Sequence, residues 1–148
     1  MKRLFILAAL ALVFTGARAQ DNEALSFKNA RILERALMSG DANQDGILTK
    51  AEADSVKIIN LIAYRVDLFK ISCYDDLAHF PNLKRIHLGY SDLEEVDLSK
   101  NPHLEEIVIG DSSLKTLILS TGCNPRLVFP SLMDQLVIKR VYTPGMWW

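Results

Sequence analysis

The chain has 148 residues, with 17 basic and 18 acidic side chains and a net charge of −1. That length allows one domain, or one domain with a small appendage. A chain without excess positive charge lacks the electrostatic footprint of a nucleic-acid-binding protein, so we expect no nucleic-acid partner.

Residues 1–19 have the features of a secretory signal peptide. Lys2 and Arg3 precede an unbroken apolar run (4–14), and an A-x-A pattern follows at 17–19. We therefore expect cleavage after Ala19 and an exported protein, which is periplasmic, secreted or at the cell surface. The run is shorter than the roughly 20 residues of a membrane span; an uncleaved anchor or a core helix is the alternative.

Cleavage at this point would change the charge of the chain. Three basic and no acidic side chains lie before the cleavage site, so the mature chain carries 14 basic and 18 acidic side chains and a net charge of −4. No later segment is long and apolar enough to predict a membrane span.

Residues 41–52 match the calcium-loop pattern D-x-[DN]-x-[DN]-G-x5-E at every required position. Calcium takes about 6–8 oxygen ligands, and alternate residues of a tight turn point at one centre. A glycine at position 46 permits the sharp bend. We predict one bound Ca²⁺ whose ligands are Asp41, Asn43, Asp45, Ile47 through its carbonyl, Thr49 through a water, and Glu52. The alternative is a solvated turn that binds nothing.

The flanks of this loop predict helices. Apolar residues recur at helical spacing before the loop, and again at 53, 56 and 59 within a segment of helix formers that spans 50–61. We expect a helix–loop–helix that resembles the EF-hand over residues 20–62, with Leu48 pointing into the core. Because only one loop is present, a structural ion is favoured over a regulatory switch. A dockerin is the rival interpretation, but dockerins use two loops that usually end in Asp.

The second half of the chain is periodic. The pattern L-x-x-L-x-L, with Ile or Val as substitutes, starts at Leu83, Leu93, Leu104 and Leu114. A full unit therefore runs from Leu83 to Leu104 and holds two copies of the pattern. A period of roughly 21 residues is typical of a leucine-rich repeat, here with two short strands or turns per coil. One coil cannot bury its apolar stripe alone, so the coils are expected to stack.

A shift by one full unit predicts which outward-facing side chains become neighbours. Opposite charges meet in three pairs: Lys84 with Glu105, Arg85 with Glu106, and Glu94 with Lys115. Cross-coil pairing explains these charges; a ligand-binding role is the alternative.

Two features at the margins of the repeat leave alternatives open. Cys73 and Cys123 are compatible with a disulfide in an oxidising compartment or with two separate buried thiols. Trp147 and Trp148 are expected either to cap the last coil or to form an exposed patch for a partner.

The order of these parts resembles exported leucine-rich-repeat proteins of Bacteroides-type bacteria that begin with a single EF-hand. The calcium loop, the phrase from Ile71 to Leu83 and the repeats carry the resemblance. It implies an α+β fold in which an EF-hand (20–62) caps a short leucine-rich-repeat solenoid with a C-terminal cap (63–148). It also implies a calcium-binding interaction module whose partner is a protein or glycan of the cell envelope. A calcium-responsive regulator is the first alternative, and an enzyme of an unrecognised class is the second.

The sequence shows no signature of an enzyme. The motifs G-x-S-x-G, H-E-x-x-H, C-x-x-C and the P-loop are all absent. His79, His87 and His103 do not have the spacing of metal ligands, so solvated histidines are expected. We therefore predict that the protein is not an enzyme.

Overall fold

The computed structural model describes residues 23–62, 71–89, 92–110, 113–129 and 135–142. The expected signal peptide and the two tail tryptophans lie outside these residues. The chain begins with helices α1 (Ala30–Gly40) and α2 (Lys50–Ser55), strand β1 (Ile58–Asn60) and a 3₁₀ helix, η1 (Asp75–His79). The remaining elements are the strands β2 (Arg85–Leu88), β3 (Glu95–Leu98), β4 (Glu106–Ile109), β5 (Thr116–Ser120), β6 (Arg126–Val128) and β7 (Val137–Val141).

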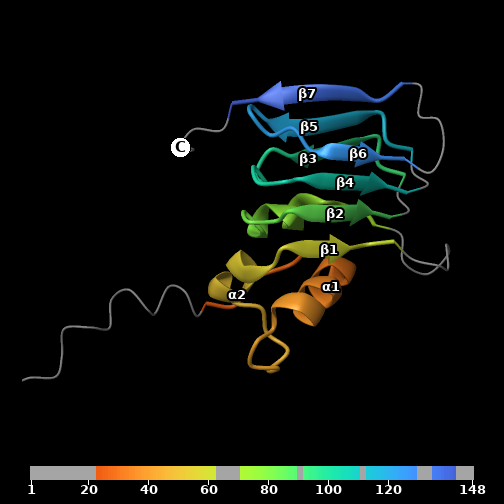
Figure 1. Cartoon of the computed structure of the whole chain (residues 1–148). Coiled ribbons are helices and arrows are strands. Elements are labelled where there is room, and N and C mark those ends of the chain that lie inside the picture. The colour runs from red at the N-terminus through yellow and green to blue at the C-terminus, as the bar shows by residue number, and fades with distance from the viewer. Residues whose placement is uncertain (1–22, 63–70, 90–91, 111–112, 130–134, 143–148) are drawn as a thin grey trace, which may run out of the picture.

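The strands form two parallel sheets, in the orders β1-β2-β4-β6 and β3-β5-β7. From β2 onward the chain alternates between the sheets, so each turn of the chain adds one strand to each sheet (Figure 1). Arg85 lies opposite Glu106 in one sheet and Glu95 lies opposite Thr116 in the other. Both pairs reproduce the interval from Leu83 to Leu104, so the predicted period and the two strands per coil are confirmed.

The core lies between the two sheets and continues toward the helices. Of the twelve apolar positions in the four repeat phrases, eleven are buried, and Leu93 packs against the core in a partly buried position. Strand β2 shows the alternation, because Ile86 and Leu88 are buried whereas Arg85 and His87 are not. Period-2 alternation of this kind directs every second side chain to the core face of a strand.

The expected fold class, an α+β fold in which an EF-hand caps a leucine-rich-repeat solenoid, is wrong. The structure is mixed α/β, with two parallel sheets and, within the described ranges, two α-helices. The N-terminal part does not form a separate helical cap, because its strand β1 pairs with β2 and is the first strand of one of the two sheets.

The expected exit helix over 50–61 is also wrong in its length. Helix α2 ends at Ser55, and Val56 has an extended backbone with φ −67° and ψ 122°. Residues 58–60 instead form β1, where Ile59 lies opposite Ile86 of β2. The spacing of buried residues at 53, 56 and 59 matches a helix, but the β-branched side chains of this segment favour a strand. The N-terminal part therefore supplies the first strand of a sheet.

Buried polar groups hold the turns of successive coils together. The Asn101 side-chain amide is fully buried and donates to the carbonyl oxygens of Leu77 and Phe80, both at 2.8 Å. The thiol of Cys123 contacts the carbonyl oxygens of Asn101 and Leu104, at 3.9 and 3.6 Å. Cys73 and Cys123 are both free thiols in the structure and form no disulfide with each other.

All three predicted cross-coil ion pairs are present. The nitrogen–oxygen distances are 2.6 Å for Lys84–Glu105, 2.8 Å for Arg85–Glu106 and 2.5 Å for Lys115–Glu94. Glu106 also pairs with Arg126 of β6, and its side chain is only 12% exposed. The hydrogen bond from Arg126 lowers the pKa of Glu106 below its ordinary value of 4.5, and the charges of Arg126, Arg85 and His87 lower it further against the opposing effect of burial.

We predict that two glycines at equivalent positions of successive coils differ in their tolerance of a side chain. An added Cβ at Gly89 would overlap the Leu61 carbonyl group, whereas at Gly110 it would lie 2.9 Å from the Leu88 carbonyl oxygen. Backbone atoms must move further in the first case, so G89A should cost about 2–4 kcal/mol of unfolding free energy and G110A about 1–2 kcal/mol. Urea unfolding measures both, and equal losses would contradict the prediction.

A second prediction concerns acid stability. Because the folded state lowers the pKa of Glu106, its stabilising contribution is complete above 4.5 and is lost as the pH falls through the lower folded-state pKa. The stability advantage of the parent over E106Q should therefore be complete above about pH 4.5 and shrink as the pH falls below it. The control is E105Q, which removes the exposed pair with Lys84. A parent–E106Q difference that stays constant with pH would refute this assignment.

Candidate metal centre

The predicted calcium loop starts where α1 ends. Asn29 caps the start of α1, because its side-chain oxygen accepts from the backbone N–H groups of Arg31 and Ile32. At the other end, Gly40 is buried, and a Cβ there would lie 2.6 Å from a methyl group of Val56. The end of α1 therefore lies close against the end of α2, next to the first loop residue. This packing fixes where the loop begins.

The backbone of the loop bends at Gly46, as the pattern requires, and also at Gln44. Gln44 and Gly46 have positive φ angles, 61° and 77°. The Gly46 N–H donates to Oδ2 of Asp41 at 3.0 Å, and the Asp45 N–H donates to Oδ1 of Asn43 at 3.0 Å. The N–H of residue 47 donates to Oδ1 of Asp45 at 2.8 Å. The side chains of three predicted ligands, Asp41, Asn43 and Asp45, therefore accept hydrogen bonds from backbone N–H groups of the loop.

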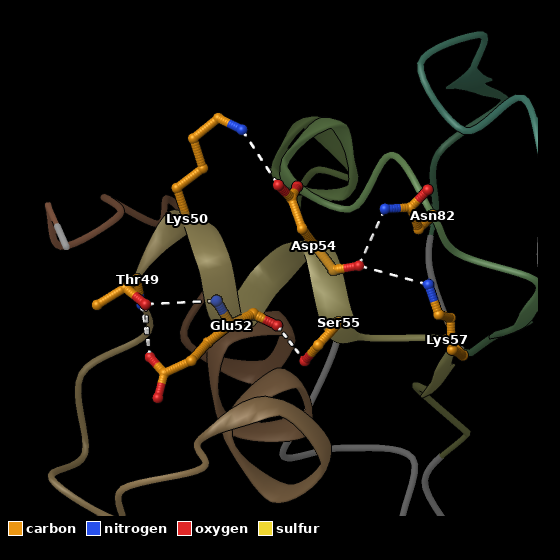
Figure 2. A network of polar contacts seen from close by, with 7 residues as sticks. All are labelled: Thr49, Lys50, Glu52, Asp54, Ser55, Lys57 and Asn82. Carbon is orange, nitrogen blue, oxygen red and sulfur yellow. Dashed lines mark hydrogen bonds and ion pairs between the residues drawn. The ribbon is translucent and has the colours of Figure 1, made fainter. Parts of the chain in front are cut away.

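Glu52 connects the two ends of the loop. Its Oε1 accepts from the Ala42 N–H at 3.1 Å, and its Oε2 accepts from the Thr49 N–H and hydroxyl at 3.0 and 2.8 Å. The Glu52 N–H donates to the Thr49 hydroxyl oxygen at 3.4 Å, which completes a capping box at the start of α2 (Figure 2). The hydrogen bonds from Thr49, followed by those from the amides of Ala42 and Asn43, lower the pKa of Glu52, so its carboxylate form is favoured.

One carboxylate oxygen of the loop has no partner. Oδ1 of Asp41 is shielded from solvent and accepts no hydrogen bond in the described part of the chain. A shielded carboxylate oxygen without a donor is costly, and a bound cation is one way to satisfy it. The first ligand of the predicted set therefore fits a metal ion.

The structure does not bring every predicted ligand to a common centre. Across the described ranges, no three Asp, Glu, His or Cys side chains form a group arranged to hold a metal. The amide nitrogen of Asn43 donates to Oδ2 of Asp45 at 2.9 Å, so these two side chains contact each other. Ile47 exposes its side chain, whereas Leu48 is buried as predicted. The predicted ligands of the loop therefore offer oxygen atoms, but their carboxylates are engaged in hydrogen bonds within the described loop rather than gathered around one centre.

The carbonyl group of Asp54 links helix α2 to the turn before β2. The side-chain amide of Asn82 and the ammonium of Lys57 donate to this oxygen at 3.0 and 3.4 Å, and Lys50 pairs with the Asp54 carboxylate at 3.2 Å (Figure 2). Of these contacts, the one with Asn82 links α2, and with it Glu52, to the segment before β2.

Two residues that contact the loop were not predicted from the sequence. The Leu25 N–H donates to the Leu48 carbonyl oxygen at 2.9 Å, and Ala24 forms an antiparallel bridge with Thr49. A single extended residue pair leaves no periodic pattern, so no signal in the sequence indicated this contact.

The histidines lie in separate surroundings. Nε2 of His79 lies 3.1 Å from the Ser26 carbonyl oxygen, and its ring is 5.0 Å from that of Phe27. His87 is partly exposed on β2, and His103 is exposed.

The chain matches no family model, no curated protein and no solved structure. Among the residues that the structure describes, no helix is long and apolar enough to cross a bilayer. The site must therefore be interpreted from its own geometry.

We predict that the Thr49 hydroxyl is needed for the start of α2. T49V removes the hydroxyl that accepts from the Glu52 N–H and donates to its carboxylate, and should cost about 1 kcal/mol of unfolding free energy. T49S keeps the hydroxyl and should lie within about 0.5 kcal/mol of the parent. Chemical denaturation measures both, and a T49V variant as stable as T49S would contradict the role of the capping box.

Proposed function

We propose that this protein binds one Ca²⁺ in the loop 41–52 and that the ion has a structural role. The observation that carries the proposal is the shielded, unpartnered Oδ1 of Asp41 in a loop whose backbone is already bent at Gln44 and Gly46. Calcium is a hard cation that prefers oxygen ligands, and every ligand position of the pattern offers an oxygen atom. The ligands would be those of the sequence analysis: the side chains of Asp41, Asn43, Asp45 and Glu52, the Ile47 carbonyl, and Thr49 through a water.

A structural role is favoured over a switch because both sides of the loop are anchored. Helix α1 packs against α2 and β1, and α2 is hydrogen-bonded to Asn82 through Asp54. A switch needs an element with two arrangements of similar free energy. The anchored helices offer no such element, so the ion would stabilise the conformation that is already present.

The charged side chains on the sheets are explained by ion pairs between coils, such as Lys84–Glu105 and Lys115–Glu94, so they do not indicate a bound ligand. The support for a binding role lies instead at the last strand, β7, where Val137, Ile138 and Val141 expose about half of their surface, at 54, 41 and 44%. Exposed apolar groups of this kind mark interaction sites. We therefore propose that the exposed apolar side chains of β7 contribute to an interaction surface for an envelope protein or glycan.

The test of the calcium proposal is a titration of the full chain with Ca²⁺. Loops of extracellular modules bind with dissociation constants of about 10⁻⁴–10⁻³ M. At about 10 mM Ca²⁺, linkage then predicts a stabilisation of about 1.4–2.7 kcal/mol relative to chelator, visible as a higher melting temperature. Circular dichroism should change little, because the ion stabilises the existing fold.

Two variants make this test specific. E52Q keeps the hydrogen bonds of the capping box, in which Gln is an accepted partner, but loses a charged ligand. Its calcium affinity should fall by at least about tenfold, since a carboxylate ligand is removed. D54N removes the same charge from the same helix outside the loop and should bind like the parent. No binding heat for the parent at millimolar Ca²⁺, or equal binding by E52Q, would reject the proposal.

A further inference from the structure

The N-terminal segment Ala24–Asn29, which we call the brace, lies between the calcium loop and η1. On the loop side, the Leu25 N–H donates to the Leu48 carbonyl oxygen at 2.9 Å, and Ala24 forms an antiparallel bridge with Thr49. These contacts fall within the second half of the loop, between the predicted carbonyl ligand at 47 and the closing ligand at 52. The brace therefore contacts the loop at residues whose backbone orientation matters for binding an ion.

The other side of the brace is fixed to the body of the protein. Asp76 of η1 is 3% exposed, and its carboxylate accepts from the backbone N–H groups of Lys28 and Asn29 at 3.0 and 2.7 Å. The ring of Phe27 lies 5.0 Å from that of His79 and 6.0 Å from that of residue 80. A buried carboxylate that accepts two amide hydrogen bonds holds its partners in one position. The brace therefore cannot shift without loss of these contacts.

These contacts constrain the loop from outside. The loop's own hydrogen bonds reach the N–H groups of Ile47 and Thr49, through the carboxylates of Asp45 and Glu52. The carbonyl oxygen of Leu48 instead accepts from the brace. This bond, which is part of the bridge between Ala24 and Thr49, holds the peptide plane between Leu48 and Thr49. The N–H group of the same peptide donates to Oε2 of Glu52 at 3.0 Å. The orientation of the Glu52 carboxylate, the predicted closing ligand, therefore depends on a peptide that the brace holds.

We propose that the brace is a positioning element that sets the calcium affinity of the loop. The inference rests on the proposed function, because it needs an ion in the loop. A preorganised site loses less ordering entropy on binding, so removal of the brace weakens binding without removal of any ligand. By linkage, calcium must in turn hold the brace more tightly against the loop.

The test compares two substitutions of one residue in the full chain. L25P removes the N–H that donates to Leu48, whereas L25A keeps that N–H and removes most of the side chain. Loss of one hydrogen bond of this kind should raise the calcium dissociation constant about 3- to 10-fold in L25P relative to L25A. Isothermal titration with Ca²⁺ gives both constants, and melts in chelator report the stability of each variant separately.

A second readout separates positioning from simple stabilisation. Amide hydrogen exchange at Leu25 should slow on addition of Ca²⁺ in the parent, and in E52Q only at much higher Ca²⁺. If the brace were purely structural, L25P and L25A would have equal calcium affinities, even if their melting temperatures differed. The rate of amide hydrogen exchange at Leu25 would then be the same with and without calcium. Either result overturns the inference. If the parent binds no calcium, the proposed function itself fails, which is a different outcome.

Discussion

The parallel pairing of strands from successive coils is the constraint on which the rest of this structure depends. No coil buries its own apolar stripe, so each one is stable only when the hydrogen bonds of its strands are made to the coil before and after it. Pairing of Ile59 with Ile86 extends this rule to the N-terminal part, because it places β1 at the start of one sheet. The end of α2, and with it the position of Glu52, follows from that pairing.

The strand register also determines which charged side chains become neighbours. Once Arg85 lies opposite Glu106 in the ladder, their side chains emerge on the same face and pair at 2.8 Å. Arg126 in the next strand adds a second cation, so the carboxylate lies between two guanidinium groups. Exposed pairs contribute little one by one, whereas the side chain of Glu106 is mostly shielded and its ionised form is tied to the folded state. The charged surface is therefore explained largely by contacts within the protein.

The conformation of the candidate calcium loop depends on hydrogen bonds within the loop, and its position depends on contacts with distant parts of the chain. Its bends and its hydrogen bonds to Asp41, Asn43 and Asp45 arise from residues of the loop itself. Its position is set from outside, by the β1–β2 pairing on one side and by the contacts of Leu25 and Asp76 on the other. A site of this kind gains affinity from the body to which it is attached, and the body gains stability from an ion in the loop.

The sequence by itself determined what depends on short-range order. The period of the repeat, the buried phrases, the three cross-coil ion pairs and the bent loop all follow from spacing and from residue chemistry. The tertiary structure alone decided the fold class, the end of α2 at Ser55 and the contact of Leu25 with the loop. The apolar spacing of a segment such as 56–61 fits a helix, whereas its β-branched side chains favour a strand, so local signals conflict. Only the open hydrogen-bonding edge of β2, which is distant in the sequence, selects the strand.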